Sequence, residues 1–113
     1  MGIGMQIVYQ GFAGSSAIEA EAGVQLLRLE RYSGVLSGCH LAIEEMHARG
    51  QRAAYDVRLD LISPSCSFKP IGHRVSEDPL AAMREAFDTA ERELGQAAAS
   101  ARAHRHGATY GNH

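Results

Sequence analysis

Four segments of the chain are predicted to be β-strands. The first is a run of strand-forming residues that includes Ile7, Val8 and Tyr9, and the other three alternate in the period of two typical of a half-buried strand. These segments are residues 5–12, 39–48, 53–62 and 71–75. In the third, one set of alternating positions is apolar and the other is charged: Tyr55, Val57, Leu59 and Leu61 against Asp56, Arg58 and Asp60. One face of the predicted sheet is therefore buried and the other meets water, as in many antiparallel sheets.

Two further segments repeat apolar residues at intervals of three and four, the spacing of an amphipathic helix. The first lies within residues 14–32, where Ser16 and Glu19 have the spacing of a capping box. The second begins after Asp78, which is placed to cap a helix whose first residue is Pro79. Its apolar positions are Leu80, Met83, Phe87, Ala90 and Leu94, and this spacing predicts a helix of about 16 residues.

The order of the predicted elements is β-α-β-β-β-α, which places the chain in the α+β class. A β-α-β crossover makes the first two strands parallel neighbours, and the next two strands add to them as an antiparallel meander. We therefore expect a four-stranded mixed sheet with two helices packed on one face, a fold that resembles the double-stranded-RNA-binding type. We place this domain at residues 1–94 and a helical extension with a flexible basic tail at residues 95–113, because large apolar residues become scarce there.

Charge is distributed unevenly along the chain. Residues 1–94 hold nine Lys or Arg against 13 Asp or Glu, whereas residues 95–113 add Arg102 and Arg105 and no acid. The formal net charge of −2 argues against a generic, high-affinity nucleic-acid binder, which is usually markedly basic. No apolar run approaches the length of a membrane span, and the first residues lack the pattern of a signal peptide, so we expect a cytoplasmic protein.

Motifs of catalysis and metal binding are missing from the sequence. It contains no nucleophile elbow, phosphate loop or Gly-rich dinucleotide fingerprint, and we expect neither an enzyme nor a bound cofactor. The six histidines do not have the spacing of a zinc site, so we expect no metal. We interpret His73, between Ile71 and Val75 on the apolar face of its strand, as a partly buried structural histidine. Cys39 and Cys66 lack Cys-x-x-Cys spacing and are expected to be buried free thiols.

Two motifs give the sequence a family resemblance. They are "LLRLERY" at residues 26–32, before a predicted strand, and "EDPLAAMREAFDTAERELG" at residues 77–95, which opens the last helix. Together they resemble the short ribosome hibernation factors, also called ribosome-associated inhibitor or protein Y. The resemblance covers roughly residues 5–94, and the predicted order of elements is also that family's own.

This resemblance implies a non-enzymatic factor that binds the small ribosomal subunit at the decoding region and silences ribosomes by occupancy. Basic side chains on the two helices would contact ribosomal RNA through its phosphates and shape. The resemblance assigns Arg28, Arg31 and Arg92 to such contacts. Where the family has several lysines at the end of the last helix, this chain has mostly alanines, followed by Arg102 and Arg105. Fewer cations at this position predict weaker binding to RNA.

Each candidate contact also has a structural interpretation. Arg28 and Arg31 lie at the end of a predicted helix, where cations complement the helix dipole. Arg92 is spaced to form an ion-pair ladder along the second helix with Arg84 and Asp88. Two other candidates, Arg49 and Arg52, lie with His47 at a predicted hairpin turn, where polar residues are common.

The competing hypothesis for the whole chain is a diverged interaction module of the same fold that does not bind the ribosome. It would use the polar sheet face around Asp56, Arg58 and Asp60 to pair with another protein or with itself as a homodimer. The net acidity of residues 1–94 favours this alternative.

Overall fold

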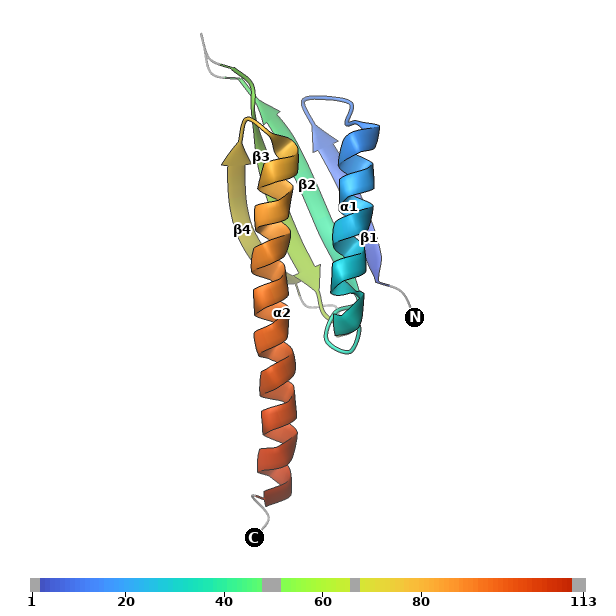
Figure 1. The fold of residues 1–113 in the computed structure, drawn as a ribbon, viewed down its shortest axis with the longest axis vertical. Coiled ribbons are helices and arrows are strands. Elements are labelled where there is room, and N and C mark those ends of the chain that lie inside the picture. The colour runs from blue at the N-terminus through green and yellow to red at the C-terminus, as the bar shows by residue number, and fades with distance from the viewer. Residues whose placement is uncertain (1–2, 48–51, 66–67, 111–113) are drawn as a thin grey trace.

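The computed structural model describes residues 3–47, 52–65 and 68–110, and for residue 68 and residues 101–110 it describes the backbone only. The elements follow the predicted order β-α-β-β-β-α (Figure 1). The chain begins with the strand β1 (Gly4–Gln10), the helix α1 (Ser16–Leu29) and the short 3-10 turn η1 (Glu30–Tyr32). The strands β2 (Gly38–Met46), β3 (Ala54–Ile62) and β4 (Phe68–Ser76) follow, and the helix α2 (Pro79–Tyr110) comes last. The α+β class predicted from the sequence is confirmed.

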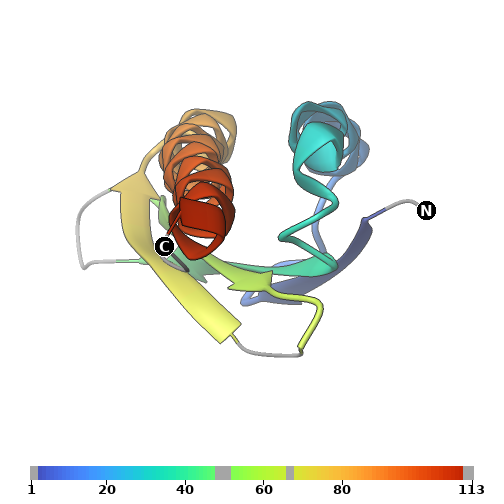
Figure 2. The same ribbon diagram turned by 90° about the horizontal axis from the view of Figure 1, so that it is seen from below.

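The four strands form one mixed sheet in the order β1-β2-β3-β4. β1 pairs in parallel with β2, and the other two pairings are antiparallel, so Ile7, Leu41 and Leu59 lie side by side across three strands. Both helices cover the same face of the sheet and leave the other face open (Figure 2). The predicted parallel crossover and meander are therefore confirmed.

The hydrophobic core lies between the sheet and the two helices. α1 contributes Ile18 and Leu29, and α2 contributes Met83 and Phe87, all at most 3% exposed. They pack against the inward side chains of the central strands, among them Leu41, Ile43, Val57 and Leu59, which are completely buried. Burial of each large apolar side chain is worth about 1.5–3 kcal/mol, so this layer holds the helices at fixed positions over the sheet.

The starts of the helices follow local hydrogen-bonding rules. α1 is capped by Ser15, whose Oγ accepts a hydrogen bond from the backbone N–H of Ile18 at 3.2 Å. The sequence had suggested Ser16 for this role, which is wrong by one position. Asp78 caps α2 as predicted, because its Oδ1 accepts a hydrogen bond from the backbone N–H of Leu80 at 2.9 Å.

A β-bulge changes which side chains of β4 face the helices. Leu59 pairs with Gly72 and Asp60 pairs with Pro70, so Ile71 is an extra residue on the edge strand, next to Gly72 with a φ of 102°. Ile71 still packs against the core, but His73 turns to the open face, where its side chain is 58% exposed. The prediction that His73 is a partly buried residue on the apolar face is wrong, because the bulge interrupts the alternation on which it was based.

The helix α2 is longer than its apolar repeat. It continues to Tyr110, beyond the repeat that ends at Leu94, and its last turns project past the sheet (Figure 1).

Cys39 is buried and free, as predicted, and burial raises the pKa of its thiol to about 12. Cys66 lies outside the described residues. In the described part of the chain, no helix is both long and apolar enough to cross a membrane.

Candidate nucleic-acid interface

The seam between α1 and α2 holds most of the charged contacts of the helical layer. We call this set the inter-helix cluster; it consists of three arginines and three carboxylates: Arg28, Arg31, Arg84, Glu21, Asp88 and Glu91. The cluster forms because charged side chains of α1, of η1 and of α2 meet when both helices pack on one face of the sheet.

Arg28 is the centre of this cluster. Its Nε lies 3.3 Å from Glu91 Oε2 and one Nη lies 3.1 Å from Asp88 Oδ1, while the other Nη donates a hydrogen bond to Gln25 Oε1 at 2.7 Å. The hydrogen bonds to Glu91 and Asp88 raise the pKa of the Arg28 guanidinium above its ordinary value. Arg28 therefore links one helix to two acids of the other.

The remaining pairs extend the cluster along both helices. Arg31 approaches Glu91 at 3.6 Å and lies over the ring of Tyr32, 4.9 Å from its centroid, yet its side chain stays 67% exposed. At the other end of the seam, Arg84 pairs with Glu21 at 3.0 Å. The pKa of Glu21 is lowered by hydrogen bonds, first from Gln25 and then from Arg84. As three positive and three negative side chains balance, the cluster offers no net positive charge.

The ladder predicted along α2 is wrong in its partners. Arg84 and Asp88 both reach across to α1 instead of pairing with each other. Arg92 is exposed and donates a hydrogen bond to Thr89 Oγ1 at 3.3 Å. Among the residues whose side chains the structure describes, Arg92 has no carboxylate partner, so it can meet a phosphate without breaking an ion pair.

The other predicted contacts are spread over the molecule. Arg52, 86% exposed, lies 3.9 Å from Glu77, at the end of the sheet where β3 begins. Arg102 and Arg105 lie on the last turns of α2, which Figure 1 shows at the opposite end of the molecule. Arg49 lies outside the described residues. The fold therefore brings Arg28 and Arg31 together but does not gather all of the predicted cations into one patch.

The open face of the sheet carries a second charged group. Asp56 pairs with His73 at 2.9 Å, and Asp60 lies 4.0 Å from His40. Arg58, exposed between these acids, makes no ion pair within residues 3–47, 52–65 and 68–100. The predicted alternation of Asp56, Arg58 and Asp60 is present, but the two carboxylates pair with histidines of the neighbouring strands instead of with Arg58.

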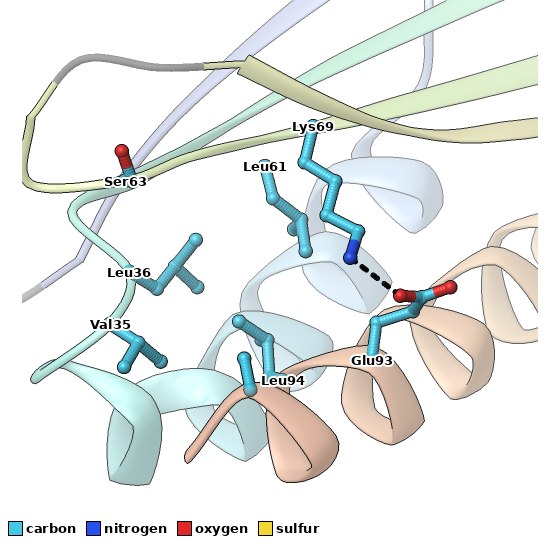
Figure 3. Close-up of a pocket in the computed structure, with 8 residues that line it drawn as sticks. Val35, Leu36, Leu61, Ser63, Lys69, Glu93 and Leu94 are labelled. Atoms are coloured by element: carbon cyan, nitrogen blue, oxygen red, sulfur yellow. Dashed lines mark ion pairs between the residues drawn. The ribbon is translucent and has the colours of Figure 1, made fainter. Parts of the chain in front are cut away.

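A small apolar hollow, not anticipated from the sequence, lies where the segment before β2 faces the middle of α2. It has a volume of about 200 Å³ and is lined by Ser63 and by five aliphatic side chains: Val35, Leu36, Leu61, Leu94 and Ala97 (Figure 3). Lys69 and Glu93 form an ion pair of 2.8 Å at its margin. Elsewhere in the described part of the chain, no group of three His, Cys, Asp or Glu side chains is arranged to hold a metal.

Sequence reasoning missed Glu21 and Glu91 as partners of the arginines, and it placed Asp88 in a ladder along α2 instead of opposite Arg28. Asp88 and Glu91 are three residues apart and so share one side of α2. That spacing was visible in the sequence, but it shows only that the two carboxylates are neighbours. Which helix lies opposite them depends on the packing of α1 and α2 over the sheet.

No protein-family model and no curated protein matches the sequence. The fold, in contrast, is similar to that of solved protein structures. One is a ribosomal subunit interface protein from Coxiella burnetii, with a TM-score of 0.69 and 18% identity over 86% of this chain and 99% of that chain. Another is the N-terminal domain of Thermus thermophilus Protein Y, with a TM-score of 0.63 and 20% identity over 85% of this chain and 98% of that domain. At these identities the similarity establishes the fold.

Proposed function

We propose that this protein associates with the ribosome, binding small-subunit RNA at the decoding region and inhibiting translation by occupancy rather than by catalysis. The main support is the fold, which covers nearly all of a ribosomal subunit interface protein. The motifs "LLRLERY" and "EDPLAAMREAFDTAERELG" add support, because they lie at the end of α1 with its 3-10 turn and at the start of α2. Such a partner would place the protein in the cytoplasm.

The exposed arginines of the helical layer are the best candidates for phosphate contacts. The Arg31 side chain is 67% exposed, and its ion pair with Glu91 is long, at 3.6 Å. Arg92 donates its hydrogen bond to the uncharged hydroxyl of Thr89. Arg102 and Arg105 add positive charge on the last turns of α2. Arg28 can take part only if a phosphate replaces at least one of its carboxylate partners, so we assign it the double role of helix clamp and contact.

The experiment is co-sedimentation with isolated small ribosomal subunits across a salt series. Arg31→Ala/Arg92→Ala should weaken binding and flatten its salt dependence by about 1.4–1.8 in log K against log salt, if two phosphate contacts are lost. The matched control, Arg58→Ala/Lys69→Ala, removes the same charge outside the proposed interface and should retain the wild-type slope. Absence of binding by the wild-type protein at low salt would refute the proposal.

The second candidate is a protein-interaction module that uses the open sheet face. The exposed position of Arg58 between Asp56 and Asp60 favours it, because an alternating row of charges can meet a complementary row on a partner. This hypothesis predicts no co-sedimentation with ribosomal subunits. It also predicts a complex that is lost in Arg58→Glu and unaffected by Arg31→Ala/Arg92→Ala.

A further inference from the structure

The two edges of the sheet differ in how they are protected. An exposed edge strand presents unpaired backbone groups, and natural proteins block such edges with lysine, proline or a bulge. β4 has all three, since it contains Lys69, Pro70 and the bulge at Ile71. This edge is therefore poorly suited to receive another strand.

The opposite edge has none of these features. β1 reads "GMQIVYQ" and holds no charged residue and no proline, and the first charged residue of the whole chain is Glu19. β1 pairs with β2 in an unbroken register from Gly4 to Gln10. It lies at the margin of the sheet in both views, with no described segment beyond it (Figures 1 and 2). β1 is thus a regular, uncharged edge strand.

The direction of its backbone groups can be derived from one hydrogen bond. The N–H of Gly4 donates to the carbonyl of Ser37, the residue before β2, at 3.3 Å. Because the N–H and C=O of one residue point to the same side of a strand and alternate along it, the backbone groups of Met5, Ile7 and Tyr9 point away from β2. Glu30 already satisfies the outward N–H of Ile3 at 3.3 Å, so the open edge begins at Met5.

The residues whose backbone groups point away from β2 also have partly exposed apolar side chains. Met5, Ile7 and Tyr9 pack against the core but remain only half-buried. An added strand would cover their exposed parts as well as their backbone groups. The edge therefore has both a hydrogen-bonding and a hydrophobic reason to take a partner.

We propose that the partner is a second copy of this chain, joined antiparallel through β1 about a two-fold axis at Ile7. Ile7 would lie opposite Ile7 of the second copy, and Met5 opposite Tyr9, so that the three outward residues of each copy supply each other's backbone partners. Identical strands can pair in this way because β1 has no charge to repel its own image. The two sheets would join into one, with the helices of both copies on the same side. This inference does not depend on ribosome binding.

Hydrogen exchange of the wild-type protein, measured by NMR over a concentration series, tests the geometry directly. The amides of Met5, Ile7 and Tyr9 should exchange about tenfold more slowly when nine-tenths of the chains are paired, since exchange then requires the free form. The amides of Gln6, Val8 and Gln10, which face β2, serve as internal controls and should be protected at every concentration. Exchange of the outward amides that does not change with concentration would overturn the proposal.

Sedimentation equilibrium with matched variants tests the location of the interface. A contact limited to one short strand from each copy belongs to the small, weak class of interfaces, so the series should extend from about 10 μM to about 1 mM. Gln6→Lys/Val8→Lys places lysines directly opposite lysines across the seam, where like charges are destabilising. It should shift the dimer dissociation constant upward by at least tenfold, without change in the midpoint of thermal unfolding of the monomer.

The control is His73→Lys/Val75→Lys, which makes comparable changes on the same open face but on β4. It should leave self-association at the wild-type level. If this variant loses the dimer and Gln6→Lys/Val8→Lys retains it, two copies meet through the open face and the proposal is wrong. A wild-type protein that is monomeric across the series would also overturn it.

Discussion

The inter-helix cluster predicts that removing two carboxylates will improve binding to RNA. In Asp88→Asn/Glu91→Gln, Arg28 loses the carboxylate charges at 3.1 and 3.3 Å and Arg31 loses the one at 3.6 Å. The amide oxygens that replace them can still accept hydrogen bonds but carry no charge. Both guanidiniums keep their positions at the end of α1, because Arg28 still donates to Gln25 and Arg31 still lies over Tyr32. The seam would then present two uncompensated cations instead of a balanced set of charges.

The size of the effect follows from the number of phosphates that become accessible. Each additional phosphate contact adds about 0.7–0.9 to the slope of log K against log salt. Arg31 already counts as a contact in the wild-type protein, so the freed Arg28 should steepen the slope by about 0.7–0.9. The loss of partly exposed ion pairs should lower the free energy of unfolding by only about 0.2–1 kcal/mol per pair. Binding therefore becomes stronger at low salt even though the domain becomes slightly less stable.

The assay is co-sedimentation with small ribosomal subunits at several salt concentrations, together with urea unfolding of the free protein. The control Glu44→Gln/Glu85→Gln removes two negative charges from exposed positions outside the cluster. It should raise affinity less and leave the slope near that of the wild type. An unchanged slope in Asp88→Asn/Glu91→Gln, or an equal change in the control, would show that Arg28 does not contact phosphate.

Three further predictions concern the stability of the fold. Phe87→Ala empties a core position that is 1% exposed and should lower the free energy of unfolding by about 3–5 kcal/mol in urea titrations. Ser15→Ala should cost about 1 kcal/mol, whereas Ser16→Ala should be nearly neutral; the reverse order would contradict the capping seen at α1. The pKa of Glu21 is lowered in the fold, chiefly by Gln25, so its stabilising contribution is present above the unfolded pKa near 4.5 and is lost as the pH falls through the folded pKa. Urea midpoints at neutral and acidic pH should therefore differ less for Glu21→Gln than for the wild type.

The elements that sequence reasoning located best are those with an unbroken hydrophobic period. β3 alternates between apolar and polar residues, and the first half of α2 repeats apolar residues at intervals of three and four. Both patterns are so regular that the buried faces follow from the spacing alone. The edge strand β4 was harder, because Pro70 shortened its predicted extent and the extra residue Ile71 reversed the expected face of His73. A bulge depends on pairing with the neighbouring strand, which local spacing does not contain.

The candidate site shows the same division at the level of single residues. The sequence placed Arg28 and Arg31 at the end of a helix and near a family-like motif, and both are there. It did not indicate that Asp88 and Glu91 would neutralise them, because the partners are separated by about 60 residues in the chain. Local charge patterns describe neighbours on one helix and not the helix that packs against it.

By itself, the sequence determined the order of the elements, the α+β class and the buried face of the central strands, because these follow from the period of apolar residues and from short-range capping. Only the tertiary structure decided which arginines are compensated, how His73 is oriented and which sheet edge is left without protection. Those properties arise from contacts between elements that are distant in the chain. They depend on how the whole sheet and both helices pack, and no local pattern specifies that.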